Sequence, residues 1–99
     1  MYARVTITQL QPGKTEEAVS IFRDSIVPAA KQQQGFKGAL LLTDPNPNAV
    51  KGITITLWET EADMSTGETS GYYQEQLAKV ASLVAAPPVR EAYEVSVQV

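Results

Sequence analysis

The sequence contains no cysteine and no histidine. Without cysteine, the chain forms no disulfide bond, offers no thiolate nucleophile and cannot ligate an iron–sulfur cluster. Without histidine, it lacks the usual general base at neutral pH, a Ser-His-Asp triad, a histidine-ligated zinc site and a histidine ligand for haem. Any chemistry must therefore come from carboxylates, tyrosines, lysines, the single tryptophan or the substrate itself.

Positive charge is also scarce and scattered. The chain has 8 lysines and arginines against 11 acidic residues, for a formal net charge of −3. Because no basic stripe is present to neutralise phosphates, we expect no binding to nucleic acid and no polybasic membrane patch. No hydrophobic run approaches the length of a membrane-spanning helix, and the first residues alternate instead of forming the apolar core of a signal peptide. The expected location is the cytoplasm.

The length of 99 residues predicts a single domain over residues 1–99. A domain of this size buries only a modest share of its surface as a monomer. Association with further copies is one way to cover the remaining apolar area.

Alternating apolar and polar residues predict four strands. They are expected over residues 2–10, 36–43, 50–59 and 89–98. A dense turn signal at 44–48 separates the second strand from the third. The third strand ends near the single tryptophan, Trp58.

Helical spacing of apolar residues predicts two longer helices. The first spans about 18 residues from an N-cap at Thr15, contains Pro28, which should kink it or tighten its last turns, and stops at Gly35. A short helical turn is expected around 62–64, and the second long helix follows over 73–84.

The resulting order β-α-β-β-α-β is typical of the ferredoxin-like α+β fold. In this fold two helices cover one face of a four-stranded antiparallel sheet. The two faces of the predicted sheet differ in composition. One is apolar and comprises Val5, Ile7, Ile53, Ile55, Leu57, Tyr93, Val95 and Val97. The other carries threonines and Trp58.

Two arrangements of these faces are open. Periodicity alone favours the apolar face under the helices, with the threonine face in solvent. Alternatively, the apolar face is covered by a second copy, most simply with two-fold symmetry, because a large uncovered apolar surface is an association site.

Two blocks of the chain resemble the antibiotic biosynthesis monooxygenase-like family of dimeric α+β barrel proteins. They are "QPGKTEEAVSIFRDSIVPAAKQQQGFKGALLL" at 11–42 and "ITLWETEADM" at 55–64. The first resembles the family's strand-end PGK, first helix and entry into the second strand, and the second resembles its strand ending on tryptophan. Family members include cofactor-free oxygenases of polyphenolic or quinol-like substrates and haem-degrading enzymes.

The resemblance implies a homodimer in which the sheets of two subunits pack face to face. It also implies a pocket between the sheet of each subunit and its own helices, with the tryptophan at its wall. The apolar face then becomes the dimer seam, and the threonine face lines the pocket. The implied ligand-binding residues are Trp58, Thr6, Thr54, Thr56, Tyr72 and Met64.

Each of these residues also has a purely structural interpretation. Trp58 is either a ligand-stacking wall or a core residue. The threonines either supply hydroxyls or simply suit a pleated surface, and Met64 either lines the pocket or fills space under the short helix. Tyr72 is the candidate for a hydroxyl in the cavity, whereas Tyr73 fits the apolar stripe and is expected in the core.

The chain departs from the family's polar residues at several positions. Haem-degrading relatives use a first-strand asparagine and a histidine after the tryptophan, where this chain has Thr6 and Gly67 or Glu68. Oxygenase relatives pair the tryptophan with an asparagine and a tyrosine, at positions occupied here by Thr54 and Met64. These departures argue against haem degradation and leave the oxygenase reaction without its usual helpers.

Other charged residues allow two interpretations. Glu59, Glu61, Asp63 and Glu68 form either a solvated acidic stretch or a carboxylate site, and the solvated stretch is favoured. Arg4 either anchors an anionic ligand or pairs with Glu94 across the sheet, and the ion pair is favoured.

The function that these observations favour is a cofactor-independent monooxygenase acting on a small aromatic or quinol-like molecule. Neither a cofactor nor a metal is expected, and no residue qualifies as the general base. The alternative is a non-enzymatic dimeric domain of the same fold that binds a small ligand.

Overall fold

The computed structural model describes residues 1–46 and 48–99. Four strands form one antiparallel sheet: β1 (Tyr2–Gln9), β2 (Phe36–Thr43), β3 (Lys51–Trp58) and β4 (Val89–Glu94). Their order across the sheet is β2-β3-β1-β4, so the two strands nearest in sequence to the termini pair with each other. This is the ferredoxin-like α+β arrangement predicted from the sequence.

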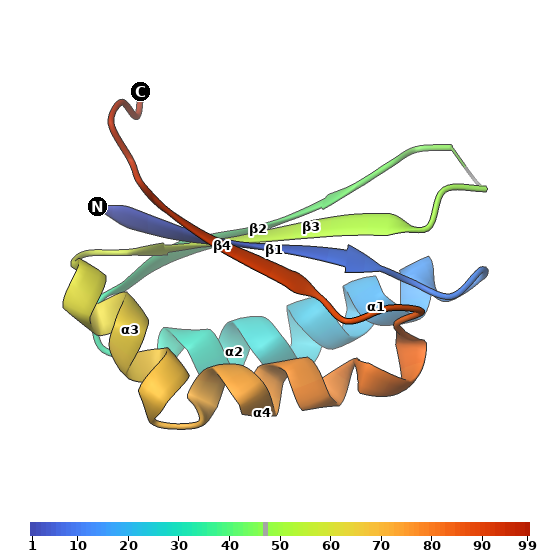
Figure 1. The fold of residues 1–99 in the computed structure, drawn as a ribbon, viewed down its shortest axis with the longest axis horizontal. Coiled ribbons are helices and arrows are strands. Elements are labelled where there is room, and N and C mark those ends of the chain that lie inside the picture. The colour runs from blue at the N-terminus through green and yellow to red at the C-terminus, as the bar shows by residue number, and fades with distance from the viewer. Residues whose placement is uncertain (47) are drawn as a thin grey trace.

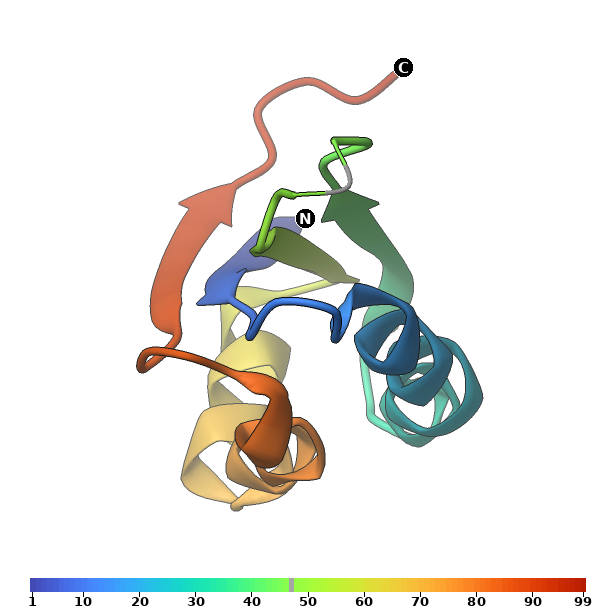
Figure 2. The same cartoon turned by 90° about the vertical axis from the view of Figure 1, so that its right-hand side faces the viewer.

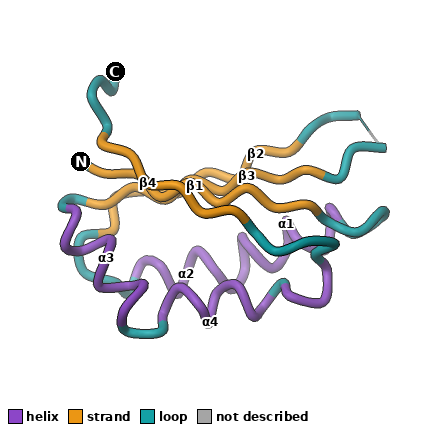
Figure 3. Tube along the Cα trace, in the orientation of Figure 1, coloured by secondary structure: helices purple, strands orange, loops and turns teal. Residues whose placement is uncertain are grey.

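Helices cover only one face of the sheet (Figures 1 and 3). Between β1 and β2 lie α1 (Thr15–Ile21), the π-helix η1 (Phe22–Ile26) and α2 (Val27–Lys31). Between β3 and β4 lie α3 (Glu61–Thr69), α4 (Tyr72–Lys79) and the short 3₁₀ helix η2 (Ala81–Leu83). Figure 2 shows the two helical units next to each other beneath the sheet. No helix in the described part of the chain is long and apolar enough to cross a membrane.

The first helical unit differs from its prediction at its start, in its interior and at its end, which is Lys31 and not Gly35. Lys14, not Thr15, is the N-cap, and its side chain makes no capping hydrogen bond. The unit is also interrupted by a π-helical turn, in which the Val27 amide bonds the Phe22 carbonyl five residues earlier. Pro28 follows directly, and its missing N–H and bulky ring disfavour a regular α-turn there. The helix is therefore widened before Pro28, where a kink or a tightened turn was expected.

Three other boundaries moved. The short helical turn expected at 62–64 is the complete helix α3, which begins because Thr60 Oγ1 accepts a hydrogen bond from the Asp63 amide at 3.0 Å. The second long helix ends early, at Lys79. The last strand ends at Glu94, and residues 95–99 leave the sheet on the side away from the helices (Figure 1).

The predicted turn at 44–48 includes Pro47, which lies outside the described residues. Before it, the Asp44 carboxylate accepts a hydrogen bond from the Asn46 amide at 2.9 Å. Asn46 Oδ1 in turn accepts one from the Asn48 amide at 2.9 Å. Such side-chain to backbone bonds are typical of Asx-turns.

Strand register fixes which residues share a face. Thr6 pairs with Thr54, Arg4 with Thr56 and Tyr2 with Trp58. Residues directly opposite each other point to the same side of the sheet, so the threonines, Arg4 and Trp58 share one face. Because helix residues line a cavity together with Arg4, Thr6 and Thr54, this is the face under the helices. The arrangement is the one implied by the family resemblance, and not the one favoured by periodicity alone.

The opposite face, which we call the open face, carries no helix. It comprises Ala3, Val5, Ile7, Gly38, Leu40, Leu42, Ile53, Ile55, Leu57, Val89, Glu91 and Tyr93. Several of its large apolar side chains are exposed in the single chain, such as Leu40 at 51% and Tyr93 at 53%. Val95 and Val97, predicted on this face, lie beyond the end of β4 instead.

Candidate functional site

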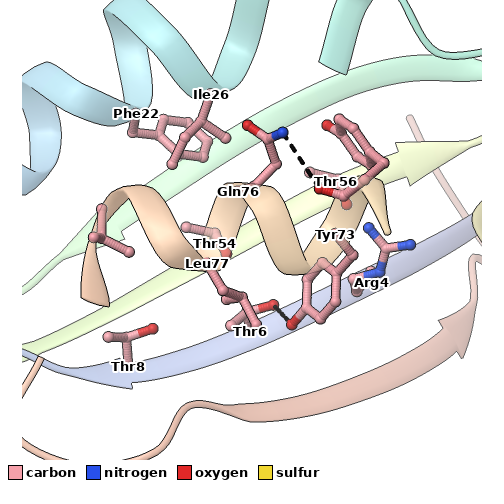
Figure 4. Close-up of a pocket in the computed structure, with 12 residues that line it drawn as sticks. Arg4, Thr6, Thr8, Phe22, Ile26, Thr54, Thr56, Tyr73, Gln76 and Leu77 are labelled. Atoms are coloured by element: carbon pink, nitrogen blue, oxygen red, sulfur yellow. Dashed lines mark hydrogen bonds between the residues drawn. The ribbon is translucent and has the colours of Figure 1, made fainter. Parts of the chain in front are cut away.

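A cavity of about 70 Å³ lies between the sheet and the helices. Residues of β1, β3, η1, α4 and the turn after α4 enclose it (Figure 4). They are Arg4, Thr6, Thr8, Phe22, Ile26, Thr54, Thr56, Tyr72, Tyr73, Gln76, Leu77 and Val80. The polar lining residues of the sheet are every second residue of β1 and β3, because alternate residues of a strand point to the same face. The helices contribute most of the apolar lining residues.

A second chamber of about 60 Å³ continues the first. The two share lining residues from the sheet and from η1, among them Thr8, Phe22 and Thr54. The second chamber is otherwise apolar, with Leu10, Ala18, Leu41 and Gly52 in its wall. Together the chambers form a groove with a polar end near Arg4 and an apolar end near Leu10.

Arg4 dominates the polar end. Its side chain is only 3% exposed and lies with its guanidinium carbon 4.4 Å from the centre of the Tyr73 ring. Nε donates to Glu68 Oε2 at 3.3 Å, and Nη2 donates to the Met64 carbonyl at 2.6 Å. No acceptor among residues 1–46 and 48–99 bonds Nη1.

The expected pairing of Arg4 with Glu94 is wrong. The residue opposite Arg4 on β4 is Ala92, and Glu94 lies opposite Tyr2. The partner is Glu68, which comes from α3 on the helical side of the sheet and also pairs with Arg90 Nη1 at 3.0 Å. A guanidinium on the covered face requires a carboxylate from the covering element, because the solvent that would otherwise compensate its charge is excluded.

Two hydroxyl groups meet beside Arg4. Thr6 Oγ1 and the Tyr73 hydroxyl are 2.8 Å apart and share a hydrogen bond, and both residues line the cavity (Figure 4). Sequence reasoning placed Tyr73 in the core and missed this hydroxyl. The adjacent pair Tyr72-Tyr73 could have indicated it. The face of a helix that packs on a sheet is wide enough for two neighbouring residues, so both tyrosines can reach the cavity.

Tyr72 also lines the cavity, as expected. Its ring packs edge-on against Trp58 with ring centres 6.4 Å apart. Burial raises the pKa of Tyr72, and the positive charge of Arg4 partly opposes this increase. The hydroxyl therefore stays protonated at neutral pH and can donate a hydrogen bond.

Trp58 and Met64 lie behind the cavity wall. Trp58 is fully buried, its Nε1 donates to Thr56 Oγ1 at 2.9 Å, and Phe36 packs edge-on against it. Met64 is buried on α3, and its carbonyl is the group that holds Arg4. Of the six residues implied by the family resemblance, Thr6, Thr54, Thr56 and Tyr72 line the cavity directly.

The acidic residues of 59–68 do not converge. Glu59 lies 3.7 Å from Lys37 Nζ, while Glu68 faces the two arginines. In the described ranges, no group of three or more acidic side chains is arranged to hold a metal ion.

Sequence comparison gives no assignment, since neither a family model nor a curated protein matches the chain. Solved structures do match its fold. A Nitrosomonas europaea protein, provisionally named an antibiotic biosynthesis monooxygenase, is 16% identical with a TM-score of 0.77, covering 98% of this chain and 100% of its own.

Two Streptomyces oxygenases are also similar in structure. The ActVA-Orf6 monooxygenase of Streptomyces coelicolor, in complex with nanaomycin D, is 14% identical with a TM-score of 0.78, over 99% of this chain and 89% of its own. SnoaB of Streptomyces nogalater, a cofactor-independent oxygenase, is 11% identical with a TM-score of 0.76, over 98% and 94%. The resemblance to antibiotic biosynthesis monooxygenase-like proteins is thus confirmed at the level of the fold.

Proposed function

We propose that the protein is a cofactor-independent monooxygenase of a small aromatic or quinol-like molecule held in the groove between sheet and helices. The observation that supports this most strongly is the groove itself. Buried hydroxyls and a cation stand at one end, and apolar walls at the other. Named neighbours of the same fold include monooxygenases and a cofactor-independent oxygenase.

In this proposal the substrate supplies all the electrons. In the enol form of an anthrone-like substrate, the methylene carbon is conjugated with a phenolic hydroxyl. Loss of the hydroxyl proton leaves an anion whose charge is shared with that carbon, and the carbon reacts with dioxygen. A carbon–oxygen bond forms, the oxygen–oxygen bond then breaks, and CH₂ plus O₂ becomes C=O plus H₂O. The protein contributes orientation, a dry environment and hydrogen bonds to the substrate oxygens.

The residues proposed for binding come from the two central strands, β1 and β3, and from α3 and α4. Thr6, Thr54, Thr56 and Tyr72 hold substrate oxygens. Trp58 packs against the Tyr72 ring behind the cavity wall. Met64 is buried on α3, also behind the wall. An apolar cavity of roughly 150 Å³ accommodates a benzene-sized ring, so a substrate must widen the groove at Phe22 and Ile26.

Oxygen consumption tests the proposal. Purified protein is incubated in air with a panel of hydroquinones and anthrone-like phenols, and uptake of dioxygen is followed alongside product formation. We expect turnover above the buffer rate, with a reduction in the Thr54→Val and Trp58→Phe variants. A matched control is Ser65→Ala, on the exposed side of α3. Buffer-rate consumption across the whole panel would reject the oxygenase.

A second function, a non-enzymatic ligand-binding domain, is favoured by one observation. None of the described residues lining the groove is a carboxylate, and the chain has no histidine. Quenching of Trp58 fluorescence by a panel compound, without turnover, would support this alternative.

We also propose that the protein is a homodimer joined through its open faces. The exposed leucines and Tyr93 of that face support this, since an apolar patch rimmed by polar residues is typical of an interface. The cytoplasmic location stays a prediction from the sequence.

A further inference from the structure

The polar end of the groove carries more positive than negative charge. Glu68 is one carboxylate shared by two guanidinium groups, those of Arg4 and Arg90. Arg90 lies towards solvent with a side chain 45% exposed, whereas Arg4 is buried. Tyr72 and Tyr73 are the other titratable groups facing Arg4, and burial raises the pKa of Tyr72, so that phenol adds no negative charge near pH 7.

The buried guanidinium of Arg4 keeps one nitrogen available for a ligand. Arg4 is fixed on two sides by Glu68 and the Met64 carbonyl, which leaves Nη1 as the nitrogen without a protein acceptor among the described residues. No side-chain N or O atom in this part of the chain is both fully buried and unpaired. Nη1 is therefore not fully buried, and Arg4 is one of the residues that line the cavity.

The backbone of α3 makes room for this arrangement at Gly67. A Cβ atom built there would lie 3.4 Å from Arg4 Nη2 and 3.1 Å from Tyr72 Cδ2. The contact with the Tyr72 ring would be tight, so the absence of a side chain at Gly67 lets α3 lie close to Tyr72 beside Arg4.

We propose that the groove selects its ligand as an anion, an ionised acidic phenol whose oxygen accepts a hydrogen bond from Arg4 Nη1. The aromatic ring extends into the apolar chamber beyond Phe22. The Thr6–Tyr73 hydroxyl pair lies beside the oxyanion and supplies a second donor. This proposal rests on the groove being the ligand site of the proposed function, and it adds the charge state of the ligand.

The proposal also accounts for a site without a general base. A positive charge within hydrogen-bonding distance stabilises a phenolate over the phenol, and so lowers the pKa of the bound ligand. The O–H bond breaks, the proton passes to solvent water, and the electron pair stays on the oxygen. Arg4 thus favours the ionised ligand through its positive charge, whereas a histidine would favour it by accepting the proton.

Binding of para-nitrophenol tests this inference, because its phenolate absorbs visibly and its phenol does not. The apparent pKa of the bound probe is compared with that of the free probe by titration of absorbance. We expect the bound value to be about 1 lower, which corresponds to about tenfold tighter binding of the anion. The methyl ether para-nitroanisole, which cannot ionise, is expected to bind at least about tenfold more weakly than the phenolate.

Two variants with opposite expected effects connect the result to Arg4. Arg4→Met removes the charge and should abolish the preference for the phenolate, whereas Glu68→Gln removes the competing carboxylate and should strengthen that preference. Arg23→Gln, at an exposed arginine paired only with Asp24, is the matched control and should change nothing. If Arg4→Met does not fold, Glu68→Gln alone still decides.

The outcomes separate this inference from the proposed function. Equal binding of both probes, with no change in Glu68→Gln, would overturn selection of the anion while leaving the ligand site intact. Failure of both probes to bind at all would remove the ligand site, and the proposed function with it.

Discussion

At the scale of single residues, the covered face of the sheet is polar, and three of its side chains are held by hydrogen bonds to side chains or to α3. Thr6 bonds Tyr73, Thr56 bonds Trp58, and Arg4 bonds α3. Burying a polar group without a hydrogen bond costs about 1–3 kcal/mol, whereas a paired group costs little. These bonds are what allow helices to pack on a face that alternation alone would leave in water.

The Thr6–Tyr73 bond gives a first prediction. Thr6→Val keeps the shape of a buried side chain but leaves the Tyr73 hydroxyl without its partner, so we expect the free energy of unfolding to fall by about 1 kcal/mol. The double variant Thr6→Val/Tyr73→Phe removes both groups and should cost less than the sum of the single changes. Urea denaturation of all four proteins measures this coupling, and additive losses would contradict it.

Tyr72 gives a prediction about alkaline pH. Because burial raises the pKa of Tyr72 above its ordinary value of 10.0, the folded state holds the phenolic proton more tightly than the unfolded state. The stability due to the neutral phenol is fully present below that ordinary value, and it is lost as the pH rises through the folded pKa. Wild-type protein should therefore lose stability above about pH 10 relative to Tyr72→Phe. Parallel denaturation curves at each pH make the comparison, and a constant difference would contradict it.

At the scale of elements, the two helical units are specified by different signals. A proline specifies the first, since η1 ends two residues before Pro28 and places Phe22 and Ile26 on the groove. A threonine cap dictates the second, since Thr60 satisfies the Asp63 amide at the start of α3. Helix α3 in turn carries both the carbonyl and the carboxylate that hold Arg4.

The cap on α3 is testable by substitution. Thr60→Ala leaves an unsatisfied amide at the helix start, and we expect a loss of about 1 kcal/mol in the free energy of unfolding. Ser65→Ala, on the exposed side of the same helix, is the control and should stay within about 0.5 kcal/mol of wild type. Thermal denaturation of the three proteins is sufficient, and an unchanged Thr60→Ala would show that packing alone sets the start of α3.

At the scale of the whole molecule, helices cover one side of the sheet and the open face has none (Figure 2). The C-terminal residues leave on that same side, with Val97 82% exposed. A sheet of this size with one uncovered apolar face is expected to bury it against a second copy.

The proposed dimer predicts the effect of a charge on the open face. Leu40→Glu is expected to fold, because Leu40 is already 51% exposed in the single chain, but to lose association through repulsion and desolvation in the seam. Light scattering should give twice the single-chain mass of 10.7 kDa for wild type and the single mass for the variant. Gln74→Glu, on exposed α4, should remain dimeric. A wild-type protein of single-chain mass at working concentrations would contradict the dimer.

The amino-acid sequence alone determined the elements and their order. Alternation over 2–10 and 50–59, the helical spacing after Pro12-Gly13, and the absence of histidine and cysteine are local or compositional properties. They predicted the α+β architecture and excluded whole classes of chemistry. Periodicity alone favoured the wrong face for the helices, because alternation separates an apolar from a polar face without showing what covers each; the family resemblance indicated the observed one.

Only the tertiary structure decided the partners across the cavity. Arg4 and Glu68 are 64 positions apart, and Thr6 and Tyr73 are 67 apart. The distance of α3 and α4 from β1 depends on how the helices pack on the twisted sheet. The close contact at Gly67 and the π-turn before Pro28 are part of that packing. Such distances result from the packing of the whole chain, so no local pattern of residues encodes them.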